Sequence, residues 1–131
     1  MKNQKVIVMD IDGTLCPIKG KDEQYADLKP KPEMIDRLRE YQTAGFYIIL
    51  NTARNMRTHG GSLGLINKHT AKVMLEWLEN HNIPYDELYY GKPWQGKGGF
   101  CVDDKTIRPS EFLDLSYEQI LEIVEPKNPN E

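Results

Sequence analysis

The stretch "KVIVMDIDGTL", residues 5–15, joins a short apolar run to two aspartates. The continuous, β-branched-rich run from Val6 predicts a fully buried strand that ends at Asp10. Side chains alternate along a strand, so Asp10 and Asp12 are expected on one face, close to a common centre. Neighbouring carboxylates of this kind raise a pKa or share a cation. The stretch therefore predicts a strand end that carries a metal, a proton or both.

Length and charge favour one globular domain, residues 1–124, followed by a disordered tail, residues 125–131. The chain has 131 residues, a net charge of -3 and a pI near 5.6, which give no reason to expect general affinity for nucleic acid. It has no apolar run of membrane-spanning length and no signal-peptide pattern, so we expect a cytoplasmic protein with no membrane partner. Cys16 and Cys101 lack metal-type spacing and are interpreted as reduced packing residues.

Hydrophobic periodicity divides the chain into alternating strands and helices. We expect a loop or hairpin over 13–31, a helix from Pro32 to just before Gly45, and a second buried strand over 46–52. A glycine-rich mobile loop over 53–67 is expected to precede a helix over 68–81. That helix is expected to turn four residues to the core: Met74, Leu75, Trp77 and Leu78. Short strands are expected within 87–91 and 98–104, and a last helix is expected behind a Ser116–Gln119 capping box.

This alternation predicts an α/β fold, a three-layer, doubly wound sheet of mainly parallel strands with helices on both faces. Ligands bind such sheets at the carboxyl ends of the strands. Polar residues that follow the apolar runs are therefore expected to meet at one rim. They are Asp10, Asp12, Asn51, Thr52, Lys92, Asp103 and Asp104.

The residues expected at this rim suit phosphoryl transfer. Carboxylate oxygens with room for water suit Mg²⁺, which usually also takes a substrate phosphate. Lys92, the Thr52 hydroxyl and the loop amides after Asp12 can hold the phosphoryl oxygens. One aspartate of the opening stretch can then attack phosphorus, and the other can move protons to the leaving oxygen and from water.

These motifs together resemble the haloacid dehalogenase-like phosphohydrolases. The resemblance spans residues 5–104 and rests on "DIDGTL" at 10–15, the strand ending in Thr52, Lys92, and "VDD" at 102–104, in that order. It implies that Asp10 is the nucleophile, that Asp12 is the general acid and base, and that Thr52 and Lys92 bind the phosphoryl group. It also implies Mg²⁺ as cofactor, held by the Asp10 carboxylate, the Asp12 carbonyl and Asp103, with Asp104 at or next to the ion.

A narrower resemblance points to the short proteins of bacterial capsular-polysaccharide biosynthesis. It rests on "NTAR" at 51–54 and "VDDKTIRPSEF" at 102–112, and implies a sugar or sugar-acid phosphate as substrate. Asn51 and Arg54 are then candidate substrate-binding residues, because phosphatases of octulosonate sugar acids also place an arginine two residues after the motif threonine. Arg57 and His59 could bind an anionic substrate but are better interpreted as solvated loop charges. Trp94 is interpreted as a packing residue, with stacking on a sugar left as the alternative.

Neither gap between the motifs is long enough for the cap domain that many relatives in this superfamily carry. An uncapped site has to admit a large substrate or be covered by a second copy of the chain, since the acyl phosphate must be shielded from water. Two alternatives to a sugar phosphatase are a polynucleotide end phosphatase and a catalytically silent phosphosugar-binding protein. The acidic pI and the lack of interleaved basic and aromatic residues argue against the first, and the intact motif set argues against the second.

Overall fold

The computed structural model describes residues 4–125, which fall into two compact units, residues 4–94 and 95–125. Apart from Glu125, the predicted disordered tail lies outside the described residues. The first unit contains the elements β1 (Val6–Asp10), η1 (Tyr25–Asp27), α1 (Pro32–Thr43), β2 (Tyr47–Asn51), α2 (Leu63–His69), α3 (Ala71–Asn80) and β3 (Glu87–Tyr89). The second contains α4 (Pro109–Asp114) and α5 (Tyr117–Val124).

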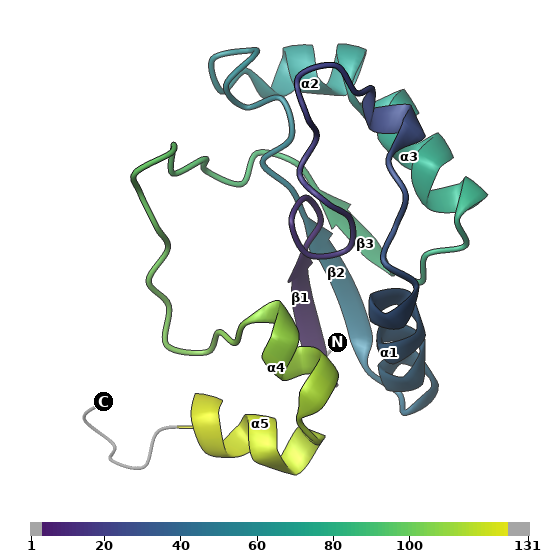
Figure 1. Ribbon diagram of the computed structural model, residues 1–131, viewed down its shortest axis with the longest axis vertical. Helices are drawn as coiled ribbons and strands as arrows, with labels where there is room; N and C mark the ends of the chain where they lie inside the picture. Colours follow the sequence, from purple (N-terminus) through teal and green to yellow (C-terminus); the bar gives the residue numbers. More distant parts are fainter. Residues whose placement is uncertain (1–3, 126–131) are drawn as a thin grey trace. The chain divides into compact units, whose positions relative to one another are not determined.

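The first unit is built on a parallel sheet with the strand order β1-β2-β3, flanked by helices (Figure 1). Asp10 lies opposite Asn51, and Asn51 lies opposite Tyr89, so the three strands end at the same rim. The predicted parallel α/β fold is confirmed. The two connections between strands, as far as residues 4–125 describe them, hold η1 and α1, and then α2 and α3, with no inserted cap domain.

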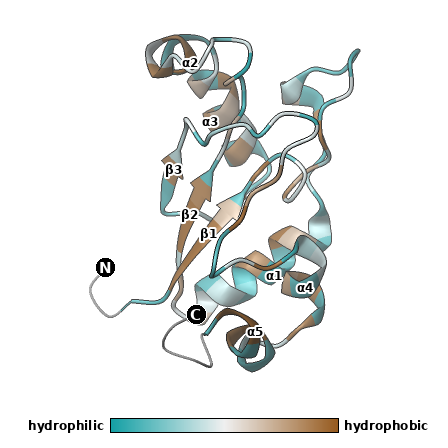
Figure 2. Cartoon of the chain, turned by 90° about the vertical axis from the view of Figure 1, so that its left-hand side faces the viewer, coloured by the Kyte–Doolittle hydropathy of each residue, from teal (hydrophilic) through white to brown (hydrophobic). Residues whose placement is uncertain are grey.

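Apolar side chains at helical spacing pack α1 against the core. Pro32 occupies its first turn, and Gly45, at φ +97°, follows its end, as predicted. The buried residues of α1 are Met34, Ile35, Leu38 and Tyr41. Figure 2 shows β2 and most of β1 in the brown of hydrophobic residues, and Ile48 and Leu50 of β2 are fully buried.

The prediction that β1 is fully buried is wrong. Met9 is buried, whereas Val6 and Val8 on the opposite face are 40% and 63% exposed. β1 stands at the edge of the three-stranded sheet, and an apolar run does not reveal whether both faces of a strand are covered.

The helical region after β2 begins earlier than expected. The loop predicted over 53–67 ends at Ser62, whose side chain caps α2 by accepting a hydrogen bond from Leu65 N. A break at Thr70 separates α2 from α3. Leu75 is exposed, which contradicts its predicted core position, because the buried face of α3 follows the spacing of Met74, Trp77 and Leu78.

In the second unit, the strand predicted over 98–104 does not form. Gly98 and Gly99 weaken a strand, and Lys105 N donates to the Asp103 carboxylate (3.1 Å), which turns the backbone. Cys101 in this segment is exposed, so its predicted packing role is wrong. The Ser116–Gln119 capping box of α5 is confirmed, and α4, which begins at Pro109, was not predicted.

No helix within residues 4–125 is long and apolar enough to cross a lipid bilayer.

Candidate functional site

A tight loop directly after β1 carries the second aspartate of the opening stretch (Figure 1). The Ile11 carbonyl accepts hydrogen bonds from Thr14 N (3.1 Å) and Leu15 N (2.8 Å), and Gly13 N donates to the Cys16 carbonyl (2.8 Å). Gly13 has φ +91°, a conformation that residues with a Cβ rarely adopt. The backbone itself therefore fixes the loop from Ile11 to Cys16 at the strand end.

The Asp10 carboxylate lies between a cation and a hydroxyl. Its Oδ1 accepts from Lys92 Nζ (3.2 Å) and its Oδ2 from Thr14 Oγ1 (3.1 Å). Backbone pairing beyond the strand ends places the lysine, because Lys92 N donates to the Thr52 carbonyl (3.1 Å). The structure thus brings together Asp10 and Lys92, which the sequence analysis predicted to converge.

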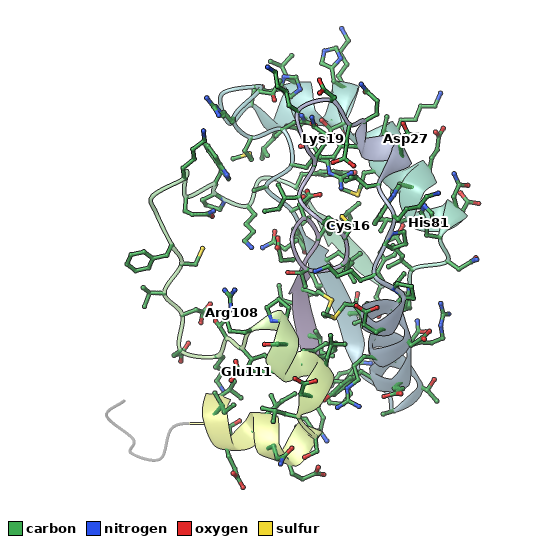
Figure 3. All side chains as sticks on the ribbon, in the orientation of Figure 1. Cys16, Lys19, Asp27, His81, Arg108 and Glu111 are labelled. Carbon is green, nitrogen blue, oxygen red and sulfur yellow. The ribbon has the colours of Figure 1, made fainter. Side chains whose placement is uncertain are left out.

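The Asp12 carboxylate has a different cation. Arg54 donates to it through two nitrogens, Nε to Oδ2 (3.1 Å) and Nη2 to Oδ1 (2.7 Å). Cys16 Sγ also donates to Oδ1 (3.6 Å), and Figure 3 shows Cys16 at the loop that follows β1. Burial, and then the negative charge of Asp12, raises the pKa of the Cys16 thiol to about 12, so the thiol stays protonated at neutral pH. The two aspartates are therefore held by separate cations.

Asn51 and Thr52 lie at the rim of the sheet, where β2 ends. Thr52 is buried and its Oγ1 accepts from Arg54 N (3.0 Å), which leaves the hydroxyl hydrogen available for another acceptor. Asn51 is half-buried and lies next to Asp10 in the sheet register.

Two aromatic rings enclose the Arg54 guanidinium. Its central carbon lies 4.1 Å from the ring centroid of Tyr25 in η1 and 5.8 Å from that of Trp77 in α3. Trp77 is anchored by a hydrogen bond from its Nε1 to the Leu28 carbonyl (2.8 Å). Burial, and then the charge of Asp12, raises the pKa of Tyr25. Arg54 is only 3% exposed, and its Nη1 has no hydrogen-bond partner in the described part of the chain.

The sequence patterns did not predict Thr14, Cys16, Tyr25 and Trp77 as neighbours of the two aspartates or of Arg54. Thr14 carried a signal, because it stands inside the "DIDGTL" motif. The other three carried none, since their contacts with Asp12 or Arg54 exist only in the folded chain.

A small pocket of about 180 Å³ adjoins Arg54. Its lining includes Gln24, Tyr25, Arg54, Asn55, His69 and Thr70. Thr70 Oγ1 donates to Asn55 Oδ1 (2.8 Å), which ties α2 to the loop after β2. The pocket therefore combines a mainly apolar surface, to which Ala26 and Val73 contribute, with amide, hydroxyl, imidazole and guanidinium groups.

The remaining loop candidates make ring contacts. His59 stacks on His69 with the ring centroids 5.5 Å apart. Arg57 lies over the Trp94 ring, 5.4 Å from its centroid. Trp94 is exposed, so its interpretation as a packing residue is wrong.

Asp103 and Asp104 are exposed residues of the second unit. The hydrogen bond from Lys105 N, and then a hydrogen bond with the Asp104 side chain, lowers the pKa of Asp103. Residues 4–125 contain no group of three or more His, Cys, Asp and Glu side chains arranged to hold a metal ion. The role of these two aspartates as metal ligands stays a prediction.

Comparison with known proteins gives one close structure and several distant ones. No family model and no curated protein matches the chain. A crystal structure of a protein from Vibrio cholerae matches with a TM-score of 0.87 and 45% identity, over 93% of this chain and 98% of that chain.

The distant matches concern the fold. A chain of the Pnkp1/Rnl/Hen1 complex matches with a TM-score of 0.50 and 20% identity, over 85% of this chain and 34% of that chain. D,D-heptose 1.7-bisphosphate phosphatase from B. bronchiseptica, solved with magnesium and phosphate, matches with a TM-score of 0.49 and 16% identity, over 77% and 57% of the two chains. On 45% identity over nearly all of both chains, this protein belongs to the same family as the Vibrio cholerae protein.

Proposed function

We propose that this protein hydrolyses phosphate monoesters with the help of Mg²⁺, through an aspartyl phosphate on Asp10. The observation that carries the proposal is the pair of differently held aspartates. Asp10 lies beside Lys92 and Thr14, whereas Asp12, two residues on, is held by Arg54. Such a division suits a nucleophile and a separate proton carrier.

In the first step, an Asp10 carboxylate oxygen forms a bond to phosphorus while the bond from phosphorus to the leaving oxygen breaks. Asp12 gives a proton to that leaving oxygen. Lys92 and the free hydroxyl hydrogen of Thr52 hold the phosphoryl oxygens as their charge changes. In the second step, Asp12 takes a proton from water, the water oxygen attacks phosphorus, and inorganic phosphate leaves a regenerated Asp10.

The Asp10 carboxylate and the Asp12 carbonyl at the end of β1 are oxygen donors of the kind that Mg²⁺ prefers, and the ion retains several waters. We assign to it the Asp10 carboxylate, the Asp12 carbonyl and Asp103, with Asp104 at or next to the ion. A bound Mg²⁺ supplies positive charge for the phosphoryl oxygens. Chelation with EDTA is expected to abolish turnover, and added Mg²⁺ to restore it.

We propose a sugar or sugar-acid phosphate of surface-polysaccharide synthesis as the substrate. The pocket beside Arg54 is mainly apolar, as small-molecule sites usually are, and its few amide, hydroxyl and imidazole groups could bond the hydroxyls of a sugar leaving group, which supports this assignment. Asn51 lies next to Asp10 at the rim, and Arg54 still has one guanidinium nitrogen, Nη1, without a partner among the described residues. Both remain our candidates for substrate contact, and a second copy of the chain or a large substrate is our candidate for covering the uncapped site.

The test is a phosphate-release assay with Mg²⁺ on an aryl phosphate, a panel of sugar and sugar-acid phosphates, and single-stranded DNA with a terminal phosphate. We expect turnover of the aryl phosphate and of at least one sugar phosphate, and none with Asp10→Asn. Asp36→Asn, an exposed aspartate of α1, is the matched control that should retain activity. Release from DNA ends alone would favour a polynucleotide phosphatase, and no turnover of any ester would favour a silent binding protein.

A further inference from the structure

The contacts of Asp12 fix the orientation of its carboxylate plane. Rotation of a carboxylate about its last side-chain bond is normally broad and two-fold. Here both oxygens are engaged by one planar edge of Arg54, Nε on Oδ2 and Nη2 on Oδ1. A parallel pair of this kind sets the direction of both oxygens.

Arg54 is in turn held from several sides. Its guanidinium lies over the rings of Tyr25 and Trp77. Its backbone N–H donates to Thr52 Oγ1, and the Arg54 side chain is 1% exposed. A guanidinium stacked on aromatic rings and excluded from water has few alternative positions. The orientation of Asp12 is therefore transmitted from η1 and α3 through Arg54.

We propose that Arg54 is a positioning residue for Asp12, which holds the carboxylate in the orientation that exchanges protons with the leaving oxygen and with water. This inference rests on the proposed function, because that function makes Asp12 the proton carrier. The positioning role uses Nε and Nη2 of Arg54, whereas the substrate contact considered above would use Nη1, which has no partner among residues 4–125.

A substitution of Arg54 should therefore lower the reaction rate by an amount that depends on the leaving group of the substrate. Arg54→Lys keeps a positive charge but lacks the two-nitrogen edge. A misplacement of about 1 Å costs about 10²-fold in rate, and general acid-base catalysis is worth about 10² to 10⁴ in total. Turnover of a small alkyl phosphate, which needs a proton on its leaving group, should fall about 10²-fold. The first step with an aryl phosphate should be spared and should give a burst of the aryl alcohol.

The decisive experiment is a double-mutant cycle with Arg54→Lys and Asp12→Asn, measured as kcat/KM on the small alkyl phosphate. If Arg54 acts through Asp12, adding Arg54→Lys to the Asp12→Asn enzyme should cause little further loss. Losses that multiply would overturn the inference and favour an independent substrate contact. A wild-type enzyme that hydrolyses neither ester with Mg²⁺ would reject the proposed function, and the inference with it.

Two further variants separate positioning from a folding defect. Arg37→Lys is the matched control, because Arg37 also pairs with a carboxylate (Glu40, 2.9 Å) and also lies over a tyrosine ring (Tyr41, 5.4 Å), but on α1. It should leave unchanged the ratio of the alkyl-phosphate turnover rate to the rate of the first step with the aryl phosphate. If Arg54→Lys does not fold, Tyr25→Leu removes one of the enclosing rings instead. That variant should lower the same ratio, and a wild-type ratio would contradict the inference.

Discussion

Removing Asp12 should destabilise this protein far more than removing Asp10, although the two aspartates are two residues apart and both form ion pairs. Asp12→Ala would leave the Arg54 guanidinium, 1% exposed, without its anion. Asp10→Ala would leave Lys92, whose side chain is 29% exposed and can turn toward water. How deeply the remaining cation is buried, rather than the presence of an ion pair, therefore decides how much stability each substitution removes.

The structure sets the expected free energies. Breaking a buried pair by removing one partner costs about 3–5 kcal/mol, which is a large share of the total stability of a domain of this size. Losing a partly exposed pair costs about 0–1 kcal/mol. The two losses therefore differ by about 2–5 kcal/mol, and with a urea dependence of about 1–3 kcal/mol per molar the unfolding midpoints of the two variants should differ by about 0.7–5 M.

Urea unfolding of the metal-free proteins, followed by circular dichroism and tryptophan fluorescence, measures both values. Glu40→Ala, which removes an exposed partner of Arg37, is the control and should resemble Asp10→Ala. Equal losses for Asp10→Ala and Asp12→Ala would refute the reasoning, because they would mean that Arg54 finds water or another anion when Asp12 is absent.

Four other measurements test separate parts of the structure. Asp10→Asn should abolish phosphate release while the protein stays folded, and a phosphoryl group trapped on any other residue would contradict the nucleophile assignment. A thiol reagent at pH 8 should modify the exposed Cys101 and spare Cys16 until the protein unfolds, as read by mass spectrometry. The folded state raises the pKa of Cys16 from 9.0 to about 12, so the stabilising contribution of the protonated thiol is complete below pH 9. This contribution is lost by about 1.36 kcal/mol per pH unit as the pH rises toward 12. Unfolding of the wild type and of Cys16→Ser across this pH range checks the sign. In denaturant unfolding, Met74→Ala, at a fully buried position of α3, should lower the free energy of unfolding by about 2–5 kcal/mol. Ser116→Ala, at the cap of α5, should lower it by about 0.5–2 kcal/mol. A larger loss for Ser116→Ala than for Met74→Ala would contradict the burial and capping described above.

Features that depend on neighbouring residues were readable from the sequence. The apolar runs at Val6 and Tyr47, the Pro32 start of α1 and the Ser116–Gln119 capping box all appear where their local pattern indicates. The alternation of strands and helices predicted a parallel sheet, and the parallel register then brought Asp10 and Lys92 to one rim. These predictions succeeded because hydrogen bonding, capping and side-chain alternation act within a few residues.

Features that depend on what packs against a segment were not readable. The same apolar composition gave a buried Met9 and an exposed Val8, and the segment 98–104 formed no strand although its composition favoured one. A strand needs a partner for its backbone hydrogen bonds, and burial needs a covering surface, neither of which is encoded in a short window.

The sequence by itself determined that Asp10, Thr52 and Lys92 meet at the rim, and the tertiary structure decided how each is held there. The motif indicated two aspartates that had to share a metal or a proton, whereas the fold provides a separate cation for each, Lys92 for Asp10 and Arg54 for Asp12. Arg54 is 42 residues from Asp12 in sequence, and the rings that enclose it come from η1 and α3. Contacts between such distant segments arise only when the chain packs, because burial and aromatic stacking then select one position of the guanidinium and, through it, one orientation of Asp12.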